Sequence, residues 1–312
     1  KLVMGPIVPY HELEPALAQR TIDAQDVSDG CFRFTIGLAK KALLADALAG
    51  LVTGIWGDLA SLTVLSAWLG LIGYALQLYF DFSGYSDMAI GLGRMLGFRF
   101  PENFRYPYLC SSISDFWRRW HISLGSWFKE YLYFPLGGSR TGTLRTLRNL
   151  LLVWLATGLW HGASWNYVLW GLYFGVLICL EKLLAPRFRA HPRKGLLAGL
   201  YRPVCLLLAV LGWVLFRAED LPAAGRYFAC LFGGAAGASA QARLYLHDFW
   251  PVLLLGAVGA TPLCAKLAGR LGAKLQPGVR AAVQAVLVLA LLACSTVWLL
   301  NGSFQSFVYF QF

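Results

Sequence analysis

The sequence predicts an all-α, polytopic membrane protein. Hydrophobic residues make up 58% of its 312 residues and charged residues 14%, and the mean hydropathy is +0.57, values typical of a chain with several membrane helices. The apolar runs are long and continuous, whereas membrane β-strands would alternate over short segments. We find no repeat, linker or soluble segment, so we expect a single transmembrane domain over residues 1–312.

The charge balance points to a membrane surface rather than to nucleic acid. Basic residues outnumber acidic ones by 27 to 16, and in membrane proteins such an excess lies mainly in cytoplasmic loops. No aromatic-plus-basic RNA motif and no helix-turn-helix pattern accompanies it, so we expect no nucleic-acid partner. The seven cysteines are scattered without a Cys-x-x-Cys pair, which favours small buried residues over a disulfide framework or a metal site.

The N-terminal third predicts one surface segment and one full membrane span. Residues 1–35 are of mixed polarity and contain three prolines, which favours a surface segment leading into a short amphipathic helix. An apolar segment at residues 42–56 precedes a span at residues 59–80. The chain starts with Lys1 and shows no signal peptide, so we interpret it as a fragment of a longer protein.

A polar cluster follows the predicted span. The sequence Phe-Asp-Phe-Ser-Gly-Tyr-Ser-Asp at residues 80–87 contains two carboxylates, Asp81 and Asp87. Such a cluster beside a membrane helix is either an interfacial cap or the wall of a polar cavity. The glycines from Gly84 to Gly97 favour close helix contact or a bent backbone.

Residues 94–148 combine aromatic with basic side chains, with nine Arg or Lys against three acidic residues. This excess indicates a cytoplasmic surface. Ser112 to Asp115 has the form of a capping box and predicts a helix start. Asp115 is spaced to form an ion pair with Arg118 or Arg119.

His121 belongs to this predicted helix. Trp117, His121, Leu124 and Phe128 recur at helical spacing, so we expect His121 to lie on an apolar stripe of one continuous helix. An interfacial amphipathic helix with a packed histidine is the structural alternative to a functional site.

Residues 150–181 are the second segment with a histidine. Apolar residues lead up to Trp160, His161 and three small residues follow, and a second apolar arm starts at Trp165 and contains Asn166. Neither arm alone reaches the roughly 20 apolar residues of a comfortable span, so we predict a re-entrant or tightly paired hairpin with His161 near its turn. An ionisable side chain in an apolar segment indicates a functional site by default, and a structural histidine that links two helices is the alternative.

The remainder of the chain has an ordinary membrane pattern. Residues 182–202 carry six basic residues and no acidic one, which predicts the cytoplasmic side. Further elements are expected at residues 203–216 (span), 217–248 (outer loop), 250–267 (span kinked at Pro262), 281–300 (span) and 304–312 (interfacial aromatic tail).

The sequence excludes several kinds of catalytic site. It has no Gly-x-Ser-x-Gly elbow, Walker sequence, His-Glu-x-x-His or metal-ligand spacing. His121 and His161 remain, both set among tryptophans. A neutral imidazole can accept the proton of an alcohol that attacks an acyl carbonyl, so acyl transfer needs little beyond one positioned histidine, an oxyanion donor and a water-poor channel.

Several long motifs resemble the membrane-bound O-acyltransferase (MBOAT) family. They begin at Gln77 (Gln-Leu-Tyr-Phe-Asp-Phe-Ser-Gly-Tyr-Ser-Asp), Phe116 (Phe-Trp-Arg-Arg-Trp-His-Ile-Ser-Leu), Tyr131 (Tyr-Leu-Tyr-Phe-Pro-Leu-Gly-Gly-Ser-Arg) and Gly158 (Gly-Leu-Trp-His-Gly-Ala-Ser-Trp-Asn). Landmarks at both ends of the chain, together with Gly-Trp-Val-Leu-Phe-Arg-Ala at residues 212–218, extend the likeness over its whole length. The family normally carries several more membrane helices before the first landmark, at residues 1–7.

The resemblance implies roles for individual residues. His161 matches the membrane-embedded catalytic histidine of the family, and His121 matches its second active-site histidine. Six further residues lie in matching motifs, and the resemblance implies that they support the histidines or line the substrate channel; helix capping and interfacial charge are their structural alternative. They are Asp81, Asp87, Arg118, Arg119, Trp160 and Asn166.

The resemblance also implies a reaction. Within the family, the motifs are most similar to the bacterial branch that O-acetylates alginate, which implies an inner-membrane subunit that moves an acetyl group from acetyl-CoA toward an extracytoplasmic polysaccharide, with no bound cofactor. Expected partners are membrane lipid, periplasmic acetyltransferase proteins and the polysaccharide acceptor; peptidoglycan stays open as acceptor. A transporter of an acyl precursor and a non-catalytic scaffold are the alternatives, although we see no internal symmetry of the transporter kind.

Overall fold

A computed structural model describes residues 5–140, 142–190, 196–301 and 307. All regular elements within these ranges are helices, which confirms the predicted all-α class. The α-helices are α1 Tyr10–Ala18, α2 Ala24–Ala39, α3 Asp46–Trp56, α4 Val64–Met95, α5 Ile113–Trp117, α6 Ile122–Phe128, α7 Thr143–His161, α8 Trp165–Ala190, α9 Leu196–Arg217, α10 Leu221–Leu231, α11 Ala240–Gly259, α12 Leu263–Gly272 and α13 Pro277–Asn301. Short 3₁₀- or π-helices occupy Lys40–Ala45, Leu59–Ser61, Pro107–Leu109 and Lys129–Tyr133.

Several helices can cross a membrane. Among the described residues, four are long and apolar enough, namely α4, α8 over Trp165–Leu184, α9 over Gly199–Arg217, and α13. The pair α11 and α12 adds a fifth if it counts as one broken span, because the two helices meet at an angle of 67°. Pro262 lies directly before α12 at this break, so the predicted kink is confirmed. The predicted aromatic tail at residues 304–312 falls almost entirely outside the described residues.

Three of the predicted elements have wrong bounds. The loop expected at residues 217–248 contains α10 and the first nine residues of α11. The span expected to end at Phe80 continues to Met95, so Asp81 and Asp87 lie inside α4 and not beyond its end. The second hairpin arm is also longer than predicted, because α8 runs on to Ala190 and is itself a candidate span. The hairpin is confirmed as a tight pair in which only α7 falls short of a candidate span.

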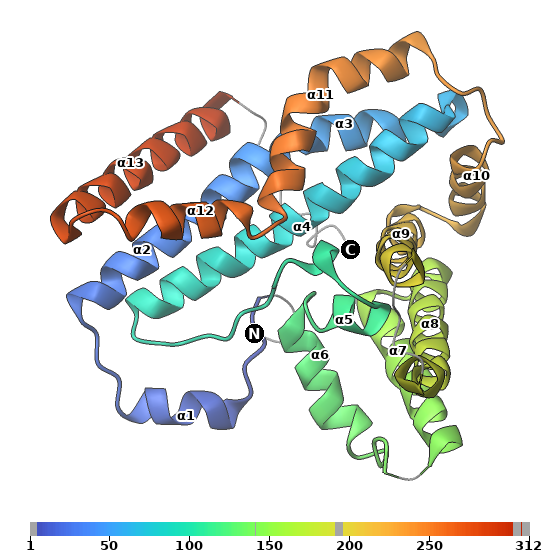
Figure 1. The fold of residues 1–312 in the computed structure, drawn as a ribbon, viewed down its shortest axis with the longest axis horizontal. Coiled ribbons are helices and arrows are strands. Elements are labelled where there is room, and N and C mark those ends of the chain that lie inside the picture. Colours follow the sequence, from blue (N-terminus) through green and yellow to red (C-terminus); the bar gives the residue numbers. More distant parts are fainter. Residues whose placement is uncertain (1–4, 141, 191–195, 302–306, 308–312) are drawn as a thin grey trace. The chain divides into compact units, whose positions relative to one another are not determined.

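The chain forms two compact units, which we describe separately. In the first unit, formed by residues 5–52, 76–105 and 248–301, α2 packs on α4 through glycines (Figure 1). A Cβ at Gly30 would lie 2.7 Å from the Gly91 carbonyl oxygen, and one at Gly37 would lie 2.5 Å from the Gly84 carbonyl oxygen. The two backbones therefore approach more closely than any side chain would allow, as the glycines of α4 predicted.

Ion pairs also join α2 and the following π-helix to α4. Asp87 accepts hydrogen bonds from Arg33 and from Lys40, and the two shortest are each 2.6 Å long. Asp81, which is 1% exposed, lies 2.7 Å from Lys41 Nζ. Because each carboxylate of α4 has a cation opposite it, both can lie inside an apolar helix.

The second unit comprises residues 53–75 and 106–247. Its centre is the antiparallel pair α7 and α8, against which α9 and the short α5 pack (Figure 1). The pair is in backbone contact, since a Cβ at Gly158 would lie 2.4 Å from the Tyr167 carbonyl oxygen and one at Gly171 would lie 2.4 Å from that of Trp154. The side chains at the end of α7 are therefore held close to the start of α8.

Candidate active site

His161 is the last residue of α7, at the turn of the hairpin. The helix ends there because Gly162 adopts φ +157° and its N–H bonds back to the Leu159 carbonyl. Three aromatic rings surround the half-buried imidazole, with centroids 4.9 to 5.1 Å away; they belong to Trp160, Trp170 and Phe216. The predicted placement of His161 near the turn is confirmed, and its surroundings are apolar.

His121 has a strained backbone. It lies between α5 and α6 with φ +45° and ψ +53°, the left-handed region that costs a non-glycine residue roughly 1–2 kcal/mol. The predicted continuous helix is therefore wrong, because the chain breaks at this residue. Strained residues persist where the surrounding structure holds them, and they concentrate at functional sites.

The two histidines share a neighbour. The ring centroid of Trp160 lies 6.2 Å from that of His121 and 4.9 Å from that of His161. His121 is 4% exposed and lies outside the candidate spans. Burial lowers the pKa of His121 well below the ordinary value for histidine, and the charge of His161 lowers this pKa further. The His121 imidazole is therefore neutral at pH 7 and can accept a proton.

A cluster of aromatic side chains encloses this pair. Trp117 of α5 packs edge-on against Trp154 of α7 at 4.7 Å and against Phe174 of α8 at 4.8 Å. Trp120 packs at 4.8 Å on Trp213 of α9. The cluster leaves His121 buried and His161 half-buried, so charge interactions at His121 are stronger than they would be in water.

Asn166 links two helix ends beside the hairpin turn. Its side chain is 3% exposed and its Nδ2 donates a 2.6 Å hydrogen bond to the Ala218 carbonyl, directly after α9. Trp160 precedes His161 and contacts both imidazoles. Both residues therefore lie in the same unit as His121 and His161, as the predicted site requires.

The two arginines of the predicted site differ in their surroundings. Arg119 Nε lies 3.0 Å from Asp115 Oδ2, which confirms the predicted ion pair, whereas Arg118 is exposed. The predicted helix start is confirmed, because the Ser112 side chain accepts a bond from the Asp115 backbone N–H. The Asp115 carboxylate accepts bonds from the backbone N–H and hydroxyl of Ser111 and not from the Ser112 N–H that a capping box would use. These contacts stabilise the start of α5 rather than the imidazoles.

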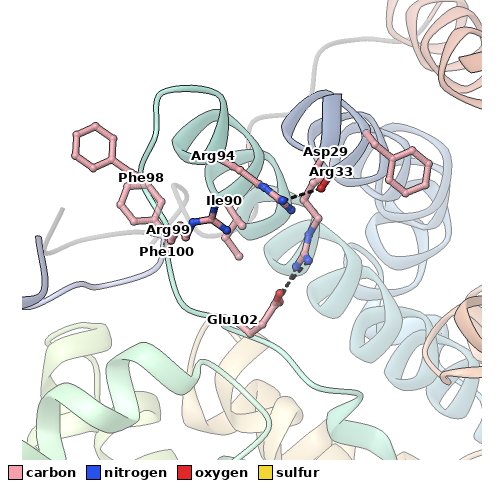
Figure 2. A pocket seen from close by; sticks show the side chains of 9 residues that line it. Asp29, Arg33, Ile90, Arg94, Phe98, Arg99, Phe100 and Glu102 are labelled. Carbon is pink, nitrogen blue, oxygen red and sulfur yellow. Dashed lines mark hydrogen bonds and ion pairs between the residues drawn. The ribbon is translucent and has the colours of Figure 1, made fainter. Parts of the chain in front are cut away.

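Asp81 and Asp87 lie in the first unit, where lysine and arginine side chains neutralise them. That unit also contains a cavity of about 430 Å³ lined by Asp29, Phe32, Arg33, Ile90, Arg94, Phe98, Arg99, Phe100 and Glu102. Figure 2 shows Arg94 directed at Asp29 and Arg33 directed at Glu102. The arginine guanidinium groups that line this cavity are paired with carboxylates, and no histidine lines it. We therefore do not take the cavity as the predicted acyl-transfer site.

Some residues of the site were missed by sequence reasoning. Trp213 and Phe216 face the histidine cluster from α9, and the Gly-Trp-Val-Leu-Phe-Arg-Ala motif that contains them was the available signal. Trp170 lies in a run of apolar residues and showed no pattern that distinguished it. Among the described residues, no cluster of three or more His, Cys, Asp or Glu side chains could hold a metal ion.

The fold and the site together define a polytopic helical membrane protein with two histidines in an aromatic cluster. Residues 1–212 match the family model described as MBOAT, the membrane-bound O-acyltransferase family. The chain belongs to this family.

Named relatives support this membership. The chain is 47% identical over 235 residues to a Pseudomonas fluorescens protein called "Probable alginate O-acetylase AlgI", a match that covers 74% of this chain and 46% of the relative. A "Peptidoglycan O-acetyltransferase" of Helicobacter pylori is 40% identical over 72% of this chain and 43% of the relative. A "Teichoic acid D-alanyltransferase" of Bacillus subtilis is 35% identical over 37% of this chain and 31% of the relative. The chain thus spans less than half the length of these relatives.

Proposed function

We propose that this protein is a membrane O-acyltransferase that moves an acetyl group toward the hydroxyls of an extracytoplasmic polysaccharide, of the alginate kind. The observation that carries the proposal is the neutral, strained His121, which shares Trp160 with His161 inside an aromatic cluster. The names of the relatives support O-acetylation as the reaction. The higher identity to the alginate-type protein, 47% against 40% for the peptidoglycan O-acetyltransferase over matches of similar length, supports the acceptor class.

The proposed chemistry uses one imidazole as base. Neutral His161 takes the proton from an acceptor hydroxyl as the oxygen bonds to the acyl carbon, and the resulting imidazolium returns that proton to the leaving group when the old acyl bond breaks. His121 is the partner that orients or relays this proton. The surrounding rings exclude water, which would otherwise compete with the acceptor hydroxyl for the acyl group.

The proposal also covers the acyl donor, the partner proteins and the membrane in which the protein lies. Acetyl-CoA is the donor, and it approaches from the cytoplasmic side where the basic segments lie. Periplasmic acetyltransferase proteins pass the group on, and the membrane is the bacterial inner membrane. One transmembrane domain carries the site. Asp81 and Asp87 act indirectly by stabilising α2 on α4 within the first unit, and Arg118 and Arg119 act indirectly through α5 in the second unit.

The test compares histidine variants in a strain that lacks the gene. Complementation with the parent protein should restore polymer-bound acetate, whereas His161→Ala and His121→Ala should each reduce it at least 100-fold, because proton transfer contributes about 10²–10⁴-fold to such rates. His247→Ala is the matched control, since His247 is exposed on α11 outside the cluster. Each variant is first compared with the parent for abundance in the membrane.

One outcome would contradict the proposal, and a second would show that the assay does not report catalysis. Full acetate in the His161→Ala strain would exclude His161 as the base. Loss of acetate in the His247→Ala strain at normal abundance would show that the assay reports general damage rather than catalysis.

A further inference from the structure

Glu181 is a carboxylate inside the hairpin with an unusual set of partners. It lies on α8, and its Oε1 accepts a 2.6 Å hydrogen bond from the Ile113 backbone N–H. Its Oε2 accepts bonds from the backbone N–H of Ser114 at 2.8 Å and from the Ser114 hydroxyl at 2.6 Å. Tyr201 of α9 donates a further 2.6 Å bond to Oε1. The donors of three of these four bonds are the first two residues of α5, Ile113 and Ser114.

Glu181 and the aromatic cluster hold α5 on one face of α8. Trp170, Phe174 and Glu181 are spaced by 4 and 7 residues, so they project from the same face of the helix. Trp117 at the other end of α5 packs on the first two of these residues at 5.5 and 4.8 Å. The short helix is therefore fixed at its start by the carboxylate and at its end by the rings.

The attachment of α5 affects the position of His121, because His121 follows Trp117 by only four residues. A five-residue helix has little stability of its own, so its position depends on these contacts. Hydrogen bonds that an ionised carboxylate accepts from N–H and O–H groups are among the stronger ones in proteins. The left-handed backbone of His121 also needs the flanking helices to hold it.

We propose that Glu181 is a positioning residue of the acyl-transfer site, which anchors α5 to α8 and thereby fixes His121. The inference rests on the proposed function for the role of His121, but the anchoring itself does not. Glu181 touches neither imidazole, so its effect passes through α5.

The test uses Glu181→Gln, which keeps the size of the side chain but replaces one acceptor oxygen by an NH₂ group. That NH₂ group faces an N–H donor, so α5 loses part of its anchor. Tyr201→Phe is the matched control, because it removes a bond to the same carboxylate without touching α5. Membranes containing each variant are treated with diethyl pyrocarbonate, and modification of His121 and His161 is followed by mass spectrometry beside polymer-bound acetate and membrane abundance.

We expect Glu181→Gln to raise the modification rate of His121 at least fivefold and leave that of His161 within twofold. Acetate should fall about tenfold to 100-fold, because a displacement of about 1 Å can cost that much in rate, while Tyr201→Phe stays within threefold of the parent in both readouts. An unchanged rate at His121, or an equal rise at both histidines, would overturn the proposal. Faster modification of His121 with unchanged acetate would support the anchoring and count against the catalytic role of His121 in the proposed function.

Discussion

Replacing Gly171 with alanine tests whether the spacing of the hairpin controls the site. A Cβ at this position would lie 2.4 Å from the Trp154 carbonyl oxygen and 3.1 Å from the Gly158 Cα, whereas ordinary contacts begin at 3.4 Å. The obstructing atoms are backbone and cannot rotate away, so α7 and α8 must separate by about 1 Å. The ring of the neighbouring Trp170, now 5.0 Å from that of His161, should shift with α8.

The expected loss is much larger in activity than in stability. Overpacking costs about 1–3 kcal/mol, and alanine returns about 1 kcal/mol of helix propensity relative to glycine, which leaves about 0–2 kcal/mol. A misplacement of about 1 Å at a reacting group can lower the rate 100-fold. Polymer-bound acetate per unit of membrane protein measures the first effect, and thermal unfolding in detergent measures the second.

Gly225→Ala is the matched control for this change. Gly225 lies inside α10 with no atom within 4 Å of an added Cβ, so alanine there should leave acetate unchanged and raise stability slightly. If Gly171→Ala retained a third or more of the parent activity, the close approach of α7 and α8 would not be what places His161. Equal losses in the two variants would show that helical glycines matter here for a reason other than spacing.

Two further predictions concern strain and charge. His121→Gly should be about 1–2 kcal/mol more stable than His121→Ala, because only glycine adopts the left-handed backbone without strain; equal melting temperatures for these two variants would argue against that conformation. Lys41→Met should destabilise the protein by about 3–5 kcal/mol, since it leaves buried Asp81 without its cation. The neighbouring Lys40→Met should cost less because Asp87 keeps its second cation, and thermal unfolding that ranked the two lysine variants in reverse would contradict the ion-pair assignment.

Hydropathy predicted most of the fold, because a membrane helix depends on the summed hydrophobicity of about 20 consecutive residues, which can be read from the local sequence. The spans after residue 200 and the break at Pro262 followed from it directly. The end of α4 did not, because Asp81 and Asp87 look like a boundary until Lys41 and Arg33 are placed opposite them. Those cations lie 40 or more residues away in the sequence, and no local pattern assigns them as partners.

The site was predicted in its residues more than in its geometry. The motifs singled out both histidines, and the turn after His161 followed from the small residues there. The helical spacing through His121 favoured one helix, yet packing of Trp117 and Trp120 on other helices outweighs that local pattern. Glu181 was missed because its role depends on backbone N–H groups of Ile113 and Ser114, which no sequence pattern reveals.

The ion pairs that α2 and the following π-helix form with α4 have a consequence for how the protein is made. A carboxylate at the centre of a helix costs about 2.5–3.5 kcal/mol during insertion, so α4 with Asp81 and Asp87 would enter a bilayer poorly by itself. Its countercharges, Arg33, Lys40 and Lys41, leave the ribosome 40 to 54 residues before the carboxylates that they pair with. The insertion machinery must therefore hold the earlier segment until α4 emerges, so that each carboxylate enters the lipid together with its cation. A long insertion between the two segments should impair biogenesis before it affects the finished fold.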